Sequence, residues 1–542
     1  MNERPLTRPA DILPPPGGER AGARGKIDAN AIFALLFGLF LGLAIWKFGN
    51  PVILDHVISP PTSLAEWQAD AWPTHWSNWI LLPLVLVGAI LVLSKPRNYR
   101  GALQAPTNID DLRKARRSQT AATKWLWLLP LLWFGWQLLS AMHTVDTFLT
   151  TTTLWQLGGC VACYFIGALV IGAPNSGSAH QRPNSSASTR TLKHEPQPDF
   201  GAGQVTGVPR AVNFLLVGVL AAFTFCLVRA ADQRLFEFSE SRKLLLEGER
   251  TGWTNFPPDL IWEMKRDGTI INTNGVDVVN PAMLARVTKG RVMGTLVYPN
   301  ALAGVILLLF PVSLALAFNS TRQLKLPIRG AAIVVTCLLG GLGLFWSGSK
   351  AGWLLALALV GIWLFRLKWS ARLKWAAVTT VVVVGLAVFA LRFHNYFTAG
   401  ATSVGARFDY WRAALQTTRD NPVFGTGPGT FQRPYEQIKS PEAEMARMAH
   451  NDYLEQFSDS GIVGGVCYAA WIGLALVTVA RRVWRSGGYL QFGLFLGLLG
   501  WFVQGLVEFS LYVPALAWTA FTLLGCLARL PSNPFDNRQA TS

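Results

Sequence analysis

Long apolar runs constrain this chain more than any other feature of its sequence. A helix needs about 20 apolar residues to cross the hydrocarbon core of a bilayer, and only helices and closed barrels satisfy their backbone polar groups in lipid. We therefore predict an all-α polytopic membrane protein with about 12 transmembrane helices. Polar breaks at "SGSK" (347–350) and at Glu508 leave eleven or thirteen spans as alternatives. The twelve runs are 30–48, 77–94, 125–142, 152–172, 211–229, 298–318, 330–347, 351–367, 375–392, 461–480, 488–506 and 510–528.

The net charge of +17 has two readings, a nucleic-acid binder or a membrane topology signal. Lys and Arg gather in alternate loops, with eight in 95–124 and four each in 173–210 and 366–374. The intervening loops 49–76 and 143–151 contain none. Because cytoplasmic loops carry the excess of Lys and Arg, we expect both termini and the basic loops to be cytoplasmic. This reading predicts membrane lipids, and no nucleic acid, as the surroundings of the basic groups.

The spacing of the runs divides the chain into membrane parts and two large external loops. Most twelve-helix transporters instead join two six-helix halves by a cytoplasmic linker and keep their external loops brief. The layout thus favours a membrane platform beneath an external working surface. The predicted parts are a disordered head 1–29, five spans in 30–230 that enclose a flexible linker at 174–206, a loop 231–297, four spans in 298–392, a loop 393–460, three spans in 461–528 and a cytoplasmic tail 529–542.

Local patterns indicate structure inside the two external loops. "LFEFSESRKLLLEGER" is typical of a helix, and the Asn-Gly of "GTIINTNGVDVV" between β-prone runs predicts a hairpin. "ARFDYWRAALQTTR" predicts a second helix, with Phe408, Trp411 and Leu415 on one face. Cys160 and Cys163 read C-x-x-C, but no second pair follows at zinc spacing, so packing within a span is the interpretation.

Polar residues predicted at the external ends of spans are candidates for chemistry, because such groups are costly at membrane depth. Lys350 in "FWSGSKAGWLL" is either an anion ligand beside helix N-terminal amides or a lysine that snorkels. Arg407 in "GARFDYW" presents a fork suited to phosphate oxygens. His450 in "MAHNDYLEQF" can take a proton near neutral pH, and Tyr453, Leu454 and Phe457 are expected to anchor its turn at the membrane interface.

Four more residues are candidate substrate ligands. Arg291 precedes "GTLVYPNALAG" and adds positive charge, while a helix cap or an interhelical hydrogen bond is the alternative for Asn300. Asn451 follows the histidine directly, and Arg412 lies one turn after Arg407, where a solvated helix face is its alternative. The sequence has no Walker-type loop, no G-x-S-x-G elbow and no paired-aspartate metal motif in either external loop.

Taken in order, these motifs resemble the bacterial O-antigen ligase and O-antigen polymerase superfamily. The resemblance covers roughly 290–528. Its matching pieces are "GTLVYPNALAGVILLL", "SGSKAGWLLALALVGIWL", "ARFDYWRAALQTTRDNPVFGTGPGTF", "HNDYLEQFSDSGIVGG" and "VEFSLYVPALAWTAFTLLG". It implies a GT-C-like glycosyltransferase of the bacterial inner membrane, without a metal or cofactor. The donor would be a glycan on undecaprenyl pyrophosphate, used on the periplasmic side.

The resemblance also assigns roles to single residues. The family's external histidine falls on His450, its loop arginine on Arg407, and the arginine of its S-G-S-R-like turn on Lys350, where this chain departs from the pattern. The acceptor stays open between the glycolipid lipid A-core, another lipid-linked glycan in a polymerase, and a protein Ser or Thr. A transporter of lipid-linked glycans is the alternative without chemistry. It should carry charged residues along its spans, which this sequence almost lacks.

Overall fold

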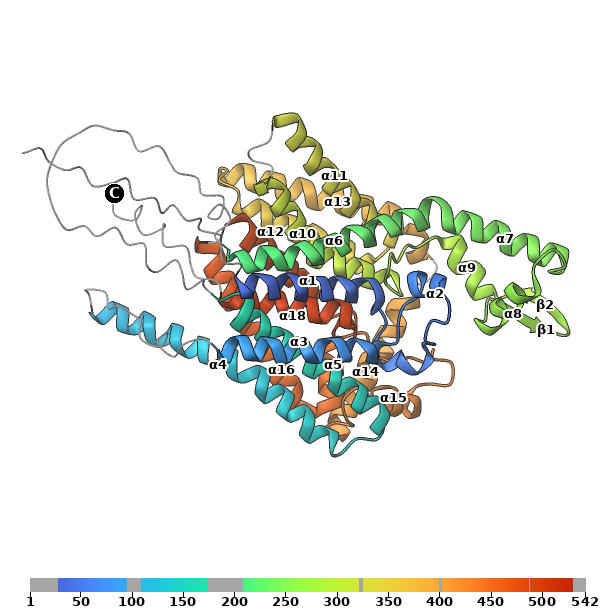
Figure 1. Ribbon diagram of the computed structural model, residues 1–542, viewed down its shortest axis with the longest axis horizontal. Coiled ribbons are helices and arrows are strands. Elements are labelled where there is room, and N and C mark those ends of the chain that lie inside the picture. The colour runs from blue at the N-terminus through green and yellow to red at the C-terminus, as the bar shows by residue number, and fades with distance from the viewer. Residues whose placement is uncertain are drawn as a thin grey trace, which may run out of the picture.

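A computed structural model describes residues 28–94, 109–173, 208–320, 325–398, 402–486 and 488–529 (Figure 1). Apart from Asp28, Ala29 and Arg529, the predicted head 1–29, the linker 174–206 and the tail 529–542 lie outside these residues. Within them the chain is almost entirely helical, and its single pair of strands is a short hairpin. The predicted all-α class is therefore confirmed for the part of the chain that the structure describes.

Each of the twelve apolar runs coincides with a helix. Eight helical segments are long and apolar enough to cross a membrane, so the chain is a multi-pass membrane protein, while twelve crossings stay a prediction. The helices of the twelve runs are α1 (Ala29–Lys47), α3 (Thr74–Leu93), α4 (Ile109–Ala141), α5 (Thr147–Ile166), α6 (Arg210–Asp232), α10 (Pro299–Ser320), α11 (Leu326–Ser347), α12 (Lys350–Arg366), α13 (Ala371–Thr398), α16 (Asp452–Ser486), α17 (Tyr489–Gln504) and α18 (Pro514–Arg529).

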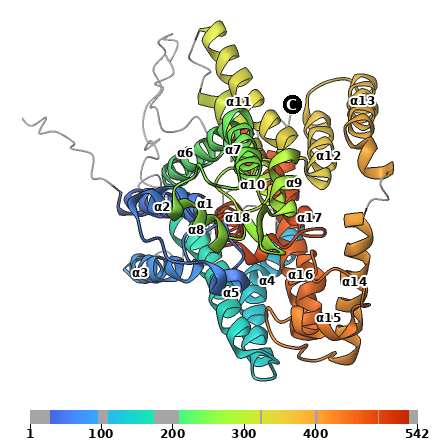
Figure 2. The same cartoon turned by 90° about the vertical axis from the view of Figure 1, so that its right-hand side faces the viewer.

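Apart from η3 (Gly167–Ile171), which continues α5, and the turn that follows α6, the remaining elements gather at one end of the bundle, on the right in Figure 1 and facing the viewer in Figure 2. They come from the loops that the sequence places together on one side of the membrane. This end carries the residues analysed below. Its elements are η1 (Val52–Val57), α2 (Leu64–Ala69), α7 (Phe238–Thr251), α8 (Pro258–Arg266), β1 (Ile270–Thr273), β2 (Val276–Val279), α9 (Pro281–Lys289), α14 (Thr402–Asp420), α15 (Gln432–Ile438) and η6 (Ser510–Tyr512).

The loop expected directly after the fifth span is instead a continuation of its helix. A π-helical turn, η5 (Gln233–Glu237), joins α6 to α7 without a break, so one helical rod runs over Arg210–Thr251. In this turn the Gln233 amide oxygen accepts the backbone N–H groups of Met293 and Gly294, and its amide nitrogen donates to the Gly294 carbonyl. The rod thereby fixes the segment that leads into α10. This segment carries Arg291, one of the candidate cations.

The predicted hairpin is confirmed. β1 and β2 pair antiparallel, with Thr273 opposite Val276. Asn274 and Gly275 form the two-residue connection, and both have positive φ, 54° and 84°. A type I′ turn needs this backbone, and Asn-Gly adopts it readily.

Small residues let the helices approach closely, as expected where lipid supplies no hydrophobic drive for association. A Cβ added at Gly38 of α1 would lie 2.3 Å from the Leu215 carbonyl oxygen of α6. Cys160 and Cys163 are free thiols buried on α5, which packs against α18. Their interpretation as packing residues is consistent with this position.

Thiol labelling of intact spheroplasts tests the orientation of the bundle. Glu263→Cys on α8 and Glu442→Cys after α15 are expected to react with a membrane-impermeant reagent, because both positions are exposed at the predicted external end. Lys368→Cys, exposed in the loop between α12 and α13, should react only after lysis. The unsubstituted chain, whose thiols lie in membrane helices, controls for background. Labelling of Lys368→Cys alone in intact cells would reverse the orientation.

Candidate functional site

A buried carboxylate, Glu508, lies at the centre of the candidate site. It follows α17 in the turn before η6, and its side chain is 1% exposed. Its Oε1 accepts hydrogen bonds from Arg407 Nη2 of α14 at 2.5 Å and from Asn300 Nδ2 at the start of α10 at 2.7 Å. A buried charge is tolerated when it is paired and hydrogen-bonded. The carboxylate therefore joins three segments that are far apart in the sequence.

Arg291 extends this network from the loop before α10. Its Nη2 donates to Asn300 Oδ1 at 3.1 Å and its Nε donates to the Ser347 carbonyl at the end of α11, at 2.8 Å. Burial lowers the pKa of the Arg291 guanidinium below its usual value, while Glu508 opposes that shift. An arginine stays charged in proteins, so Arg291 is a fixed cation. Asn300 thus bridges the cation and the carboxylate through its amide, in a role closer to the predicted interhelical hydrogen bond than to a free ligand.

His450 faces the other oxygen of the same carboxylate. Its Nδ1 lies 3.7 Å from Glu508 Oε2, and neither buried atom has a hydrogen-bond partner among the described residues. The ring stacks on Tyr410 at 5.8 Å between centroids and meets Phe509 edge-on at 4.7 Å. About a third of the side chain, 31%, is exposed although Nδ1 is buried. The imidazole therefore turns one nitrogen toward Glu508 and presents another part of its ring to the outside.

The backbone at His450 has positive φ, 50°. Such a conformation is uncommon for a residue other than glycine and marks a position that the surrounding structure holds in place. Two residues later, the Asp452 N–H donates to the Glu508 carbonyl at 3.1 Å. Glu455 Oε2 accepts the Ala449 N–H at 3.0 Å. These bonds on either side of His450 fix it relative to Glu508.

Lys350 supplies a third cation from the first turn of α12. Its Nζ lies 3.7 Å above the Tyr396 ring and 5.3 Å from the centre of the Phe393 ring, both on α13. Arg291, Arg407 and Lys289 are close enough to interact with it electrostatically. A lysine that snorkels would extend away from the protein, whereas this ammonium lies over aromatic faces beside other cations. The arrangement favours the anion-ligand interpretation.

Two further candidate ligands, Asn451 and Arg412, lie outside the hydrogen-bond network around Glu508. Asn451 is buried, and its Oδ1 accepts the N–H groups of Tyr453 and Leu454, so it caps α16. Arg412 is exposed on α14, which agrees with a solvated helix face. Neither residue hydrogen-bonds to Glu508, Arg291 or Arg407 among the described residues, and substrate binding stays a prediction for both.

The predicted anchoring of the His450 turn at the membrane interface needs correction. Tyr453 donates its hydroxyl proton to the Phe502 carbonyl and packs against Tyr468, and Leu454 packs beside Tyr410. The residues expected to face the interface are therefore at least partly covered by other helices. These residues are half-buried, so the turn packs against other helices on one side and keeps the other side exposed.

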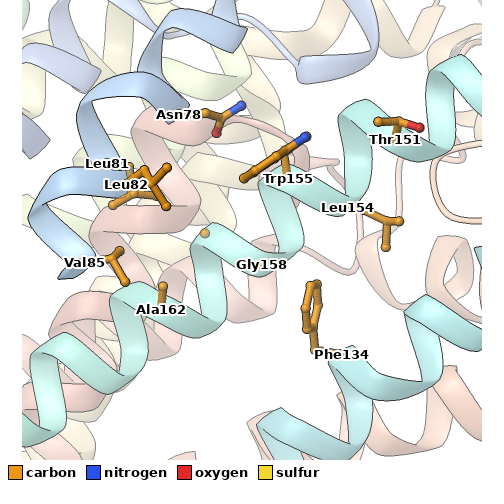
Figure 3. A pocket seen from close by; sticks show the side chains of 11 residues that line it. Asn78, Leu81, Leu82, Val85, Phe134, Thr151, Leu154, Trp155, Gly158 and Ala162 are labelled. Atoms are coloured by element: carbon orange, nitrogen blue, oxygen red, sulfur yellow. The ribbon is translucent and has the colours of Figure 1, made fainter. Parts of the chain in front are cut away.

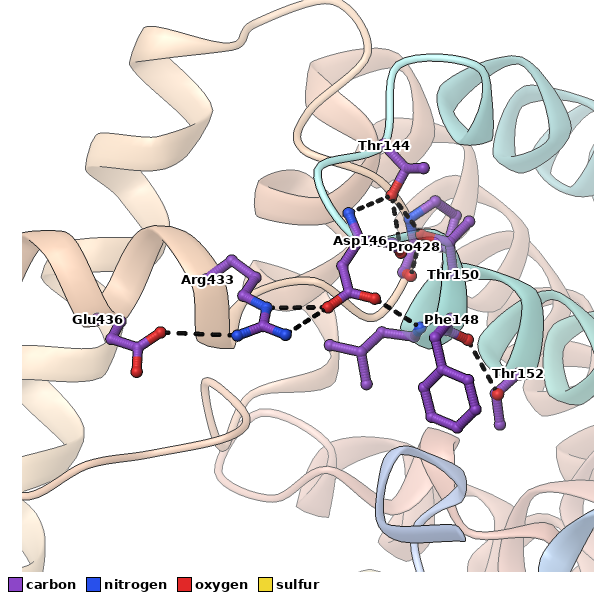
Figure 4. Close-up of polar contacts among 9 residues, drawn as sticks. Thr144, Asp146, Phe148, Thr150, Thr152, Pro428, Arg433 and Glu436 are labelled. Atoms are coloured by element: carbon purple, nitrogen blue, oxygen red, sulfur yellow. Dashed lines mark hydrogen bonds and ion pairs between the residues drawn. The ribbon is translucent and has the colours of Figure 1, made fainter. Parts of the chain in front are cut away.

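Polar contacts between helices position the loop that carries Arg407 and His450. Arg433 of α15 donates from Nε and Nη2 to Asp146 Oδ2, at 2.9 and 2.7 Å (Figure 4). Burial opposes ionisation of Asp146, but hydrogen bonds from Leu149 N–H and Arg433 outweigh it and lower the pKa of this carboxyl. Asp459 Oδ2 accepts the Gly429 N–H at 2.7 Å. The loop is thus tied to the start of α5 through α15 itself and to α16 just before α15.

Glu508 is the central site residue that the sequence treats only as a polar break. A signal was present, because a carboxylate inside an apolar run is costly unless it is paired. Its partners could not be named, since they come from α10 and α14. Tyr396 and Phe393 were missed for the same reason: nothing local indicates that α13 faces Lys350.

Part of this chain resembles a known protein family. Residues 335–469 match the family model described as O-antigen ligase. The family resemblance inferred from the sequence motifs is thereby confirmed over this range. The matched range runs from α11 into α16 and includes Lys350, Arg407 and His450. Arg291, Asn300 and Glu508 lie outside this range.

One curated relative was also found. A protein of Haemophilus influenzae named "Uncharacterized protein" is 28% identical over 180 residues, which cover 29% of this chain and 44% of the relative. The match therefore spans less than half of that relative's length. The name of this relative states no activity.

Replacing Arg407 tests whether Glu508 depends on it. Arg407→Ala leaves a buried carboxylate without its cation, a change that costs ~3–5 kcal/mol when a buried pair loses one partner. We expect the lower end of that range, because the Arg407 side chain is itself 20% exposed. Thermal unfolding in detergent measures the loss. Arg412→Ala, one helical turn away and exposed, is the matched control and should melt as the parent does. Equal melting of the two variants would show that the ion pair does not stabilise the fold.

Proposed function

We propose that this protein is an O-antigen ligase-type glycosyltransferase that moves an oligo- or polysaccharide from undecaprenyl pyrophosphate to an acceptor hydroxyl. The observation that carries the proposal is the gathering of Arg291, Arg407 and Lys350 beside His450 at one end of the bundle. Only one carboxylate, Glu508, pairs with these cations among the described residues. The site therefore keeps excess positive charge for an anionic group. The family match of this region supports the reaction class.

The reaction assigned to this geometry is a single displacement. The acceptor oxygen attacks the anomeric carbon of the glycan, and the bond from that carbon to the pyrophosphate oxygen breaks, so configuration inverts. His450 accepts the hydroxyl proton on the nitrogen that does not face Glu508. Arg407 and Lys350 stabilise the charge that develops on the leaving pyrophosphate. Glu508 Oε2 lies 3.7 Å from Nδ1 and acts as a positioning residue, because a carboxylate beside Nδ1 favours the tautomer that carries its proton there.

The proposed setting is the bacterial inner membrane, with the site on the periplasmic face and both termini in the cytoplasm. The family resemblance implies the membrane, and the alternation of basic loops supports the orientation. Cationic side chains take the role that a metal has in many pyrophosphate reactions, so we propose that transfer needs no metal.

The acceptor distinguishes three forms of this function. Lipid A-core would make the protein a ligase, a second lipid-linked glycan would make it a polymerase, and a Ser or Thr would make it a protein O-oligosaccharyltransferase. Deleting the gene and asking whether lipopolysaccharide, capsule or glycoprotein loses its polymer decides among them. If no glycoconjugate changes and flipping of lipid-linked glycan stops, the protein is a transporter.

His450→Ala should abolish transfer while leaving expression and membrane insertion intact. Loss of a general base costs about 10²–10⁴-fold in rate. The measurement is in-vitro transfer from an undecaprenyl-pyrophosphate glycan by the purified protein. His394→Ala, on the exposed end of α13, is the matched control and should keep the parent rate. Parent activity in His450→Ala would contradict the assignment of the base.

Lys350→Gln should impair the same transfer roughly 10- to 150-fold, the effect of losing a charge-assisted contact of about 1.5–3 kcal/mol. Lys350→Arg keeps the charge and should be tolerated, with the guanidinium able to stack on Tyr396 in place of the ammonium. EDTA should change neither variant. Parent activity in Lys350→Gln would restore the snorkelling interpretation and leave Arg291 and Arg407 as the anion ligands.

A further inference from the structure

An apolar groove opens among four membrane helices on the side of the bundle where α11 and α12 separate. It has a volume of about 390 Å³. Its walls come from α10, α11, α12 and α17, and nearly all of its lining is apolar. Phe310, Gly341, Leu344, Ala356, Trp363 and Leu496 are among the lining residues. Gly341 leaves room in the wall, since a Cβ built there meets no atom within 4 Å.

The groove begins just below the cationic site. Its first residue on α11, Leu344, lies one helical turn from Ser347, whose carbonyl binds Arg291. On α12 the lining begins at Ala356, six residues after Lys350. At 1.5 Å per helical residue these offsets are about 5 and 9 Å. The lining then continues down α12 to Trp363. A charged headgroup at the site and a chain in the groove can therefore belong to one molecule.

We propose that this groove holds the isoprenoid chain next to the pyrophosphate of the lipid-linked donor. The inference rests on the proposed function, because that function places the pyrophosphate at Arg291, Arg407 and Lys350. A branched, unsaturated chain can pack closely against the Leu, Phe and Trp side chains of the groove, and in lipid such van der Waals packing is what holds it there. The cations above the groove select a chain that ends in phosphate groups, which favours the donor over a neutral glyceride.

A second groove provides a comparison within the same molecule. It lies between α3, α4 and α5, with a volume of about 380 Å³, and is lined by residues such as Asn78, Phe134, Trp155 and Ala162 (Figure 3). None of the helices that line it contributes Arg291, Arg407 or Lys350. A membrane groove alone therefore does not define a donor site. The inference depends on the continuity between the first groove and the cations.

Filling the first groove tests the proposal. Gly341→Leu places a side chain in open space within the groove. We expect the KM for a C55 pyrophosphate-linked glycan to rise about tenfold, because the new side chain overpacks the space that the isoprenoid chain occupies, with kcat nearly unchanged. A donor with the same glycan on a two-isoprene chain should lose little. Ala356→Phe, on the facing helix, should give the same chain-length-dependent effect.

Gly330→Leu is the matched control. It makes the same substitution on the same helix, also in open space, at a residue outside the groove. Ala162→Leu fills the second groove instead, and both controls should keep the parent KM for the C55 donor. An unchanged KM in Gly341→Leu and Ala356→Phe would overturn the inference and leave the groove to membrane phospholipid. Absence of transfer from either donor by the parent protein would overturn the proposed function itself.

Discussion

The buried charge of Glu508 determines how the external end of this protein is assembled. A carboxylate that is 1% exposed cannot remain ionised without partners. Arg407 comes to it from α14 and Asn300 from α10, and Asn300 in turn holds Arg291. Two helices far apart in the sequence, α10 and α14, therefore converge on one carboxylate oxygen, Oε1. The same convergence leaves Oε2 free to face His450.

The scaffold below this cluster is held by polar groups as well as by apolar packing. Trp133 and Gln137 of α4 both donate to Gln456 Oε1 of α16, and the Gln456 amide donates to the Tyr512 hydroxyl. In an apolar medium such bonds have few competitors, so they fix the rotation of α16 about its axis. That rotation determines where the strained residue His450 points. Chemistry at the surface thus depends on contacts buried one to two turns deeper in the same helix.

The sequence predicted helices and local turns well because those depend on residues close together in the chain. All twelve apolar runs became helices, and Asn274–Gly275 formed the expected turn. Motif order also placed Lys350, Arg407 and His450 in one site, although spacing alone could not show that Glu508 joins them. The sequence failed where apolar residues face protein instead of lipid, as at Tyr453, since hydrophobicity is the same in both cases. It failed again at Gln233, where a π-helical turn continued a helix that polarity suggested would end.

The substitution of lysine for the arginine of the family pattern is consistent with its surroundings. An arginine binds phosphate through two parallel N–H bonds at the edge of its plane, whereas lysine offers a single compact charge. At Lys350 the space above the helix end is occupied by Tyr396 and Phe393, and the ammonium lies over their faces. A compact charge held by cation–π contact still adds to the field of Arg291 and Arg407. Guanidinium forks then remain at Arg291 and Arg407, so the site combines two directional cations with one point charge.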